Sequence, residues 1–309
     1  MSESAYDLGS VAGSPARGTA RVSAAAASAA GRGRLQLRGI TKRFDGTDQP
    51  AIEGVSLACE PGEFVVVVGP SGCGKSTLLN IAAGMVRPDA GHVWLDGQAA
   101  DGPGPQRAMV FQDHGLFPWL TAAQNIEFGL KMAGMGRSER QDRAAEALRV
   151  VHLSQAAGKL VHQLSGGMRQ RVAIARALVM DPSVLLMDEP FAALDAQTRT
   201  LLHQQLQEVW LATHKTVLFV THSVGEAARL ADRIVVLHAH PGRIRREIAV
   251  SLPHPRLLDS PEMGHLVHTV RKEIEDEVNR VRAELEGDSW QPAGGAGVGD
   301  DSAELGGGI

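Results

Sequence analysis

Short runs of branched apolar residues alternate along this chain with longer segments whose apolar positions recur every three or four residues. The runs at 64–68, 184–187 and 217–220 are continuously apolar, which is typical of strands buried on both faces of a parallel sheet. Further strands are predicted at 35–40, 92–95, 108–111 and 234–237. Because helical segments fill the intervals, the pattern predicts an α/β domain with a largely parallel sheet.

Capping signals predict where several helices begin. Thr121 and Ser138 each stand three residues before a glutamine, a pattern in which the two side chains bind the first backbone N–H groups reciprocally. Ser260 and the proline after it predict the start of a last helix, over about 261–286. Its apolar residues form one stripe opposite a charged face, so we expect it to pack on the domain's own surface. Contact with a partner is the alternative.

The two ends of the chain differ in composition from the middle. Residues 1–33 are rich in Ala, Gly and Ser, and residues 287–309 are rich in Gly with few large apolar side chains. Such segments bury too little apolar surface to offset the entropy of ordering, so both are predicted to be disordered tails. The predicted globular domain therefore covers residues 34–286.

Composition limits the kinds of partner. Hydrophobic residues make up 43% of the 309 residues, enough for a sizeable core, and the net charge of −4 disfavours nucleic acid as a partner. No apolar run reaches the roughly 18 residues that a membrane-spanning helix needs, so any membrane role would depend on a separate protein. The two cysteines are too few for a disulfide framework and indicate a reducing, cytosolic compartment.

A glycine-rich segment joins the strand predicted at 64–68 to a helix. It consists of Gly69, Pro70, Ser71, Gly72, Cys73, Gly74, Lys75, Ser76 and Thr77. Residues 69–76 match the pattern G-x-x-x-x-G-K-[ST], whose glycines let backbone N–H groups surround phosphate oxygens at a helix N-terminus. The lysine supplies a charge to the β- and γ-phosphates, and the serine hydroxyl is a ligand for Mg²⁺. The strand–loop–helix order predicts a nucleoside triphosphate site and disfavours the alternative, a loop without function.

Two further segments carry candidate chemistry. The strand at 184–187 ends in Asp188 and Glu189, where the first carboxylate can hold Mg²⁺ through a water and the second can orient or deprotonate an attacking water. Residues 164–167 (LSGG) place small residues and a hydroxyl just before a predicted helix, which repeats the phosphate-binding arrangement. An ordinary helix cap is the alternative for this segment.

These segments resemble, in identity and order, the motifs of the ABC ATPase family. The motifs are, in chain order, Walker A (69–77), the Q-loop (Gln112), the signature (164–167), Walker B (Asp188 and Glu189), the D-loop (Asp195) and the switch histidine (His222). The resemblance covers about residues 34–250, and six ordered motifs make it specific.

The resemblance implies a fold and an assembly. Family members are P-loop NTPases with a mostly parallel core sheet, an antiparallel β subdomain and an inserted α-helical subdomain, here about 113–180, that carries the signature. In the family each ATP, with its Mg²⁺, lies between Walker A of one subunit and the signature of another. This chain has one copy of each motif, so we expect it to pair with a second ATPase subunit, in the first instance another copy of itself.

The resemblance also implies roles for single residues. The γ-phosphate would be bound across the interface by Ser165, Gly166 and Gly167. Gln112 would ligate Mg²⁺ and sense the membrane partner, while His222 would stabilise transition-state charge. Asp195 would couple the two ATP sites. Phe44 is the candidate for the ring that stacks on adenine, with an ordinary core residue as the alternative.

One residue departs from the family pattern, and another raises the question of chemical reactivity. Met168 stands where the signature often continues with glutamine, which removes one possible polar contact. Cys73 lies inside the phosphate loop, and we interpret it as chemically inert.

Within the family the chain resembles the stand-alone ATPases of nitrate, sulfonate and taurine importers. The similarity rests on residues 102–107 before the Q-loop, on 116–120 after it, and on 240–243. It does not choose among these solutes, because an extracytoplasmic binding protein delivers the cargo and the ATPase never touches it. We therefore expect a peripheral subunit on the cytoplasmic face of the inner membrane. The alternative is a soluble ABC ATPase that acts in repair or signalling.

A short apolar segment follows the Q-loop. Phe117, Pro118 and Trp119 predict an exposed apolar surface, which usually marks a docking site in a soluble protein. We expect transmembrane permease subunits to dock there, and an internal packing cluster is the alternative.

Overall fold

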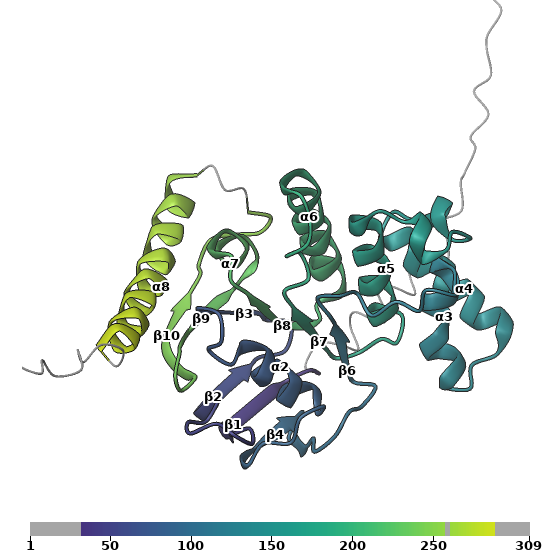
Figure 1. Ribbon diagram of the computed structural model, residues 1–309. Coiled ribbons are helices and arrows are strands. Elements are labelled where there is room, and N and C mark those ends of the chain that lie inside the picture. The colour runs from purple at the N-terminus through teal and green to yellow at the C-terminus, as the bar shows by residue number, and fades with distance from the viewer. Residues whose placement is uncertain (1–31, 257–259, 288–309) are drawn as a thin grey trace, which may run out of the picture.

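The computed structural model describes residues 32–256 and 260–287. Figure 1 shows two sheets beside one another, with a group of helices at one side and a long helix at the other. Nearly all of the two predicted tails lies outside the described residues.

The larger sheet has six strands in the order β10-β9-β3-β8-β7-β6. Its strands are β3 (Phe64–Val68), β6 (Arg107–Val110), β7 (Val184–Asp188), β8 (Thr216–Thr221), β9 (Arg233–His238) and β10 (Arg243–Ala249). All neighbours pair in parallel except β10 with β9. The mostly parallel sheet is therefore confirmed, and every strand predicted in it starts and ends within one residue of the observed bounds.

The smaller sheet is antiparallel, as the family resemblance implied. Its strands, in the order β2-β1-β4-β5, are β1 (Leu35–Lys42), β2 (Ile52–Cys59), β4 (Ala90–Leu95) and β5 (Gln98–Ala99). The pattern of apolar positions did not predict β2, because Gly54 interrupts the alternation between Ile52 and Val55.

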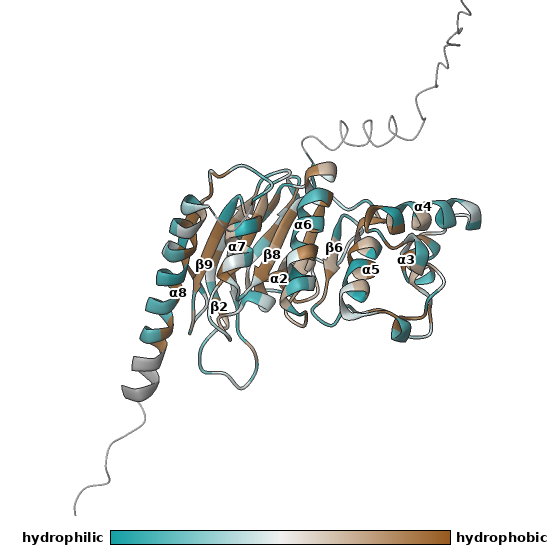
Figure 2. Cartoon of the chain, turned by 90° about the horizontal axis from the view of Figure 1, so that it is seen from above, coloured by the Kyte–Doolittle hydropathy of each residue, from teal (hydrophilic) through white to brown (hydrophobic). Residues whose placement is uncertain are grey.

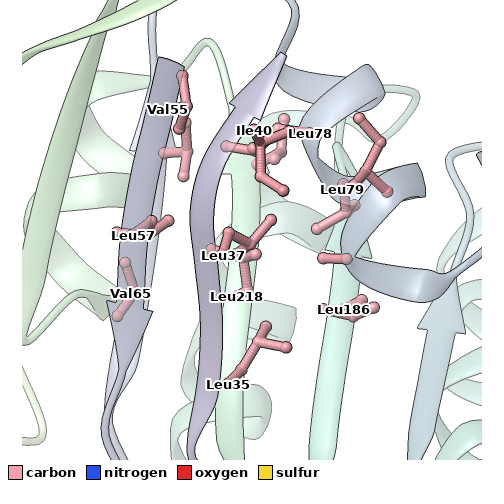
Figure 3. Packing of buried hydrophobic residues seen from close by; sticks show 14 of the residues in the cluster. Leu35, Leu37, Ile40, Val55, Leu57, Val65, Leu78, Leu79, Leu186 and Leu218 are labelled. Carbon is pink, nitrogen blue, oxygen red and sulfur yellow. The ribbon is translucent and has the colours of Figure 1, made fainter. Parts of the chain in front are cut away.

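Side chains of β3 divide the core into two layers, because successive residues of a strand point to opposite faces. Val65 and Val67 join a cluster with the small sheet and with α2 (Lys75–Ala83). Figure 3 shows this layer, in which Leu35 and Leu37 of β1 lie among side chains of β8, β7 and α2. Phe64, Val66 and Val68 belong to the opposite layer.

The helices that cover that opposite layer include α6 (Ala196–Thr213), α7 (Val224–Leu230) and α8 (Pro261–Gly287), and one face of α5 (Gly166–Leu178) also packs into it. Ser260 caps α8 as predicted, since its hydroxyl accepts a hydrogen bond from the backbone N–H of Met263 at 3.2 Å. Met263 and Val270 are buried, so α8 packs on this chain's own domain, as expected. Figure 2 shows hydrophobic strands beneath helices whose outer turns are hydrophilic. Within the described ranges, no helix combines the length and the apolar character needed to cross a membrane.

The remaining helices form a group with its own core. They are α3 (Ala122–Met132), α4 (Arg137–Val150) and α5 (Gly166–Leu178), joined by the 3-10 turns η1 (Ser154–Ala156) and η2 (Val161–Gln163). The reciprocal cap at Thr121 is confirmed. The cap predicted at Ser138 is wrong: α4 begins at Arg137, and extended Gly136 precedes it without a side-chain cap. Arginine is a good helix former, so the helix starts two residues earlier than a cap at Ser138 would place it.

Candidate functional site

Four parallel strands of the large sheet end at one edge, and each is followed by a predicted motif. The register pairs Val68 with Thr221, Asp188 with Val220, and Val110 with Met187. Ligands of open α/β sheets bind at the carboxyl ends of the strands, so this edge is the expected place for a site. Figure 1 shows β3, β8, β7 and β6 side by side in the sheet.

The loop after β3 is shaped by glycines. Gly74 has a φ of +88° and directly precedes α2, and a Cβ there would lie 2.6 Å from the carbonyl oxygen of Ala51. A Cβ on Gly69 would lie 2.7 Å from the Cys73 sulfur. Side chains at these positions would displace the loop, whereas glycine leaves the backbone N–H groups at the start of α2 free to face an anion.

Lys75 lies beneath this loop, and its side chain is directed at it. The residue is 6% exposed, and its Nζ donates hydrogen bonds to the carbonyl oxygens of Gly69 (2.9 Å) and Pro70 (2.8 Å). Ser71 and Gly72 at the tip are exposed. A buried ammonium group below an open ring of amides fits the phosphates of a nucleotide, because charge-assisted hydrogen bonds to phosphate are strong.

Cys73 faces the protein interior from the same loop. Burial raises the pKa of its thiol, although Lys75 lies near it and lowers the pKa in part. A thiol with a raised pKa carries little reactive thiolate at neutral pH. This supports the interpretation of Cys73 as inert.

A hydroxyl and a carboxylate meet behind the loop. Ser76 Oγ donates a hydrogen bond to Asp188 Oδ1 at 3.0 Å, although the two residues are 112 positions apart. Burial raises the pKa of Asp188, the hydrogen bond from Ser76 lowers it in part, and the charge of Glu189 raises it further. These oxygen donors suit Mg²⁺. The described part of the chain contains no group of three or more His, Cys, Asp or Glu side chains that could hold a metal alone, so phosphate oxygens and water would have to complete the coordination.

Glu189 and His222 form a second pair at the edge. His222 Nδ1 lies 2.9 Å from Glu189 Oε2, and the histidine side chain is 61% exposed. The Glu189 backbone has a φ of +41°, which is rare for a residue other than glycine, and its N–H is bound to Val220 O at 3.0 Å. Strained backbone of this kind is concentrated at functional sites. The structure therefore brings together the predicted base and the predicted switch histidine.

Gln112 follows β6 and is exposed. The next turn is held by Arg176 of α5, whose guanidinium donates hydrogen bonds to the carbonyl oxygens of His114 (2.9 Å) and Gly115 (2.6 Å). Arg176 could not be recognised from the sequence, because a single arginine on an amphipathic helix carries no distinguishing signal. The contact links the Q-loop segment to the helix that begins at the signature.

The signature residues lie at the start of α5. Ser165 caps this helix, since its Oγ accepts a hydrogen bond from Met168 N at 3.3 Å. A Cβ on Gly167 would lie 2.5 Å from Thr198 Cγ2 of α6, and one on Gly166 would lie 3.3 Å from Leu194. Figures 1 and 2 both place α5 beyond β6 as seen from α2, so the two predicted phosphate-binding segments lie apart within one chain.

The D-loop residue and the candidate adenine ring have different surroundings. Asp195 caps α6, and the hydrogen bond from Thr198 N (2.9 Å) lowers the pKa of its carboxyl group. Phe44 follows β1 and is 43% exposed, with Lys42 Nζ 5.7 Å from its ring centroid. The alternative that Phe44 is a core residue is therefore wrong.

The apolar segment after the Q-loop is partly exposed. Trp119 is 71% exposed and Pro118 is exposed, whereas Phe117 is half-buried with its ring centroid 4.5 Å from that of Phe128. Buried Asn125 fixes the segment, because its Oδ1 accepts a hydrogen bond from Phe117 N at 2.8 Å. Beside it is a groove of about 430 Å³ lined by Trp119, Leu120, Gln124, Glu127, Phe128, Lys131, Arg137, Arg140 and Gln141. The internal-cluster alternative thus applies to Phe117 but not to Trp119.

Comparison with known protein families and sequences gives a consistent result. The family model described as ABC transporter matches residues 52–192. A putative ATP-binding protein of Brucella abortus is 48% identical over 72% of this chain and 85% of its own length. The taurine import ATP-binding protein TauB of Mesorhizobium japonicum is 50% identical over 69% of this chain and 82% of its own. The nitrate import ATP-binding protein NrtD of a Synechocystis strain is 49% identical over 66% of this chain and 76% of its own length.

Solved structures give the same result for the fold. A dimeric ATP-binding cassette in a post-hydrolysis state, bound to ADP and Pi, superimposes with a TM-score of 0.63. That chain is 35% identical in sequence, and the match covers 71% of the present chain and 100% of the cassette.

Proposed function

The chain belongs to the ABC transporter family as an ATP-hydrolysing importer subunit, and we propose that two copies of it close on two MgATP molecules to drive solute uptake. The observation that carries the proposal is the convergence at one sheet edge of the Lys75 cradle, the Ser76–Asp188 pair and the Glu189–His222 pair.

ATP binding is assigned to the loop of residues 69–77. The backbone N–H groups of the loop and the Lys75 ammonium would hold the phosphates, and the exposed ring of Phe44 would stack on adenine. Ser76, Asp188 and Gln112 would hold Mg²⁺, which supplies positive charge to the β- and γ-phosphates when it is bound.

Hydrolysis is assigned to the pair beside the cradle. Glu189 would accept a proton from the attacking water, while His222 would donate a hydrogen bond to the charge that develops on the γ-phosphoryl oxygens. Their 2.9 Å contact keeps the two side chains next to one another, so that both can act on the same phosphoryl group.

The second copy would complete each site. Because Ser165, Gly166 and Gly167 lie apart from the Walker A loop of their own chain, they would bind the γ-phosphate held by the partner, and Asp195 would couple the two sites. The similarity to a dimeric cassette bound to ADP and Pi supports this arrangement.

A membrane permease would receive the motion of the closing dimer. The groove beside Phe117, Pro118 and Trp119 offers an exposed aromatic anchor with charged residues around it, which suits a docked permease segment. The subunit would then lie peripherally on the cytoplasmic face of the inner membrane. The names of the taurine and nitrate import relatives support nitrate, a sulfonate, taurine or a similar small solute, delivered by an extracytoplasmic binding protein.

Co-purification tests this proposal. The tagged chain would be isolated from gently solubilised membranes and its partners identified by mass spectrometry, in parallel with Trp119→Ala and with Leu211→Ala, an exposed residue on α6 away from the groove. We expect a multi-span permease with the wild type and Leu211→Ala, and much less with Trp119→Ala. If only soluble or nucleic-acid-processing proteins are recovered, the assignment as an ATPase is unaffected, but the proposed role in an importer is wrong.

A further inference from the structure

A buried carboxylate contacts the residue that precedes the predicted switch histidine. Glu226 is 4% exposed, and its Oε2 accepts a hydrogen bond of 2.6 Å from the hydroxyl of Thr221, which is 2% exposed. Its other oxygen lies 3.3 Å from Nε2 of His203, which is also buried. Burial alone would raise the pKa of Glu226, but the hydrogen bonds from His203 and Thr221 outweigh it and lower the pKa, so the group is ionised at neutral pH.

These contacts fix the backbone on both sides of His222. Thr221 precedes it, and the Thr221 hydroxyl accepts a hydrogen bond from Ser223 N at 3.0 Å. Ser223 follows it, and the Ser223 hydroxyl accepts one from Glu226 N at 3.3 Å. The His222 side chain projects into solvent except for its contact with Glu189, so its direction depends on this backbone.

The same carboxylate also contacts the helix that begins at the D-loop. His203 lies on α6, and Arg199 of α6 places its Nε 4.0 Å from Glu226 Oε1. Arg199 also donates a hydrogen bond to the carbonyl oxygen of Leu194 at 2.8 Å, immediately before Asp195. The His203 ring packs edge-on against Phe191, two residues after Glu189, at a centroid distance of 4.9 Å. The segments that follow β7 and β8 therefore meet at one buried charge.

We propose that Glu226 is a positioning residue for hydrolysis, which holds the backbone of His222 in a defined relation to α6 and so aligns the histidine with Glu189. The inference rests on the role proposed for His222. Glu226 was not among the residues predicted from the sequence, although Ser223 and Glu226 have the S-x-x-E spacing of a capping box. In the structure only the serine half of that box forms, since the glutamate side chain binds Thr221 and His203 instead.

The test uses the full-length chain with MgATP. Glu226→Gln keeps the size of the side chain and removes its charge, so we expect kcat to fall by about tenfold or more while the KM for ATP stays within about twofold. The matched control is Glu277→Gln on α8, a carboxylate that is also buried beside a histidine but lies away from the site. It should lose stability while keeping its kcat. Thr221→Val should reproduce the loss of kcat and Thr221→Ser should restore it, which provides a second test if Glu226→Gln folds poorly.

The combination with His222→Ala separates positioning from a general structural role. If Glu226 acts through His222, then adding Glu226→Gln to His222→Ala lowers the single-turnover rate no further. An equal additional loss in that background, or a normal kcat in both Glu226→Gln and Thr221→Val, overturns the inference. If His222→Ala itself turns over normally, the role proposed for His222 fails, and the positioning role fails with it.

Discussion

Two adjacent carboxylates at the end of β7 have different partners. Asp188 accepts a hydrogen bond from the Ser76 hydroxyl, whereas Glu189 contacts the His222 imidazole. In the proposed function the first pair would provide oxygen donors for a cation, and the second would combine a base with a hydrogen-bond donor. Neighbouring carboxyl groups can take separate roles when their environments differ in this way.

This separation predicts different kinetic effects at single residues. Glu189→Gln should keep ATP affinity within about twofold and lower kcat by at least about 100-fold, because the base is lost while the cradle is intact. Lys75→Ala should instead weaken ATP affinity by at least about tenfold, since a charge-assisted contact to phosphate is lost. Equilibrium binding of a fluorescent ATP analogue and steady-state phosphate release measure the two effects. Glu208→Gln, an exposed carboxylate on α6, is the matched control.

A Glu189→Gln variant that hydrolyses ATP at the wild-type rate would show that the general base lies elsewhere. Unchanged affinity in Lys75→Ala would count against the cradle.

Site residues could be predicted from sequence where the chemistry is local. The loop of residues 69–76 can be recognised as a phosphate-binding motif because its glycines, its lysine and its hydroxyl are neighbours in the chain. Arg176 and Glu226 could not be found in this way, because their partners are defined only by the fold: Arg176 binds carbonyl oxygens 61 and 62 positions away, and Glu226 meets His203 on another helix.

At the scale of elements, the strands predicted most closely are those whose residues are buried along nearly their whole length. The strands β3, β7 and β8 are continuous apolar runs, and their bounds follow closely from the sequence. Strand β2 was missed, because its pairing with β1 includes a register shift and its apolar alternation is interrupted. The start of α4 was misplaced because a helix can begin without a side-chain cap.

Helix α8 is anchored by one buried carboxylate in addition to its apolar stripe. Glu277 is fully buried, and its oxygens contact His238 Nδ1 (2.6 Å), the backbone N–H of Ala239 (2.8 Å) and Arg245 Nη1 (3.2 Å). Burial would raise the pKa of this group, but hydrogen bonds from Arg280, Ala239 N and His238 lower it from 4.5 to about 2.

The lowered pKa predicts how stability depends on pH. A carboxyl group whose pKa is lower in the folded than in the unfolded state stabilises the fold above about pH 4.5, and this contribution is lost as the pH falls towards 2. Glu277→Gln should therefore lower the free energy of unfolding at pH 7 by about 2–3 kcal/mol. The difference from the wild type should shrink as the pH falls below about 4, as measured by urea unfolding.

The matched control for this prediction is Glu275→Gln, an exposed position on the same helix, which should change stability by less than about 0.5 kcal/mol. Equal effects of the two substitutions would show that Glu277 contributes no specific anchoring.

At the scale of the whole molecule, the proposed assembly follows from the separation of the two predicted phosphate-binding segments. The Walker A loop lies at the end of β3 and the signature at the start of α5, beyond β6. In the proposed function a single copy therefore carries two incomplete sites of different kinds, and a symmetric pair would complete both. The sequence could predict this pairing only through the family resemblance, because the distance between the segments depends on the fold.

Mixing two inactive variants tests whether two copies share each ATP site. Lys75→Ala disables the cradle, and Ser165→Glu places a negative charge where the partner's γ-phosphate would bind, at a helix N-terminus that tolerates an acidic residue. Each variant alone should have little ATPase activity. In an equimolar mixture half of the dimers contain both variants and one intact composite site, so phosphate release should recover to about a quarter of the wild-type rate. If the mixture stays as inactive as its components, each chain hydrolyses ATP with its own residues alone, and the account of a shared site is wrong.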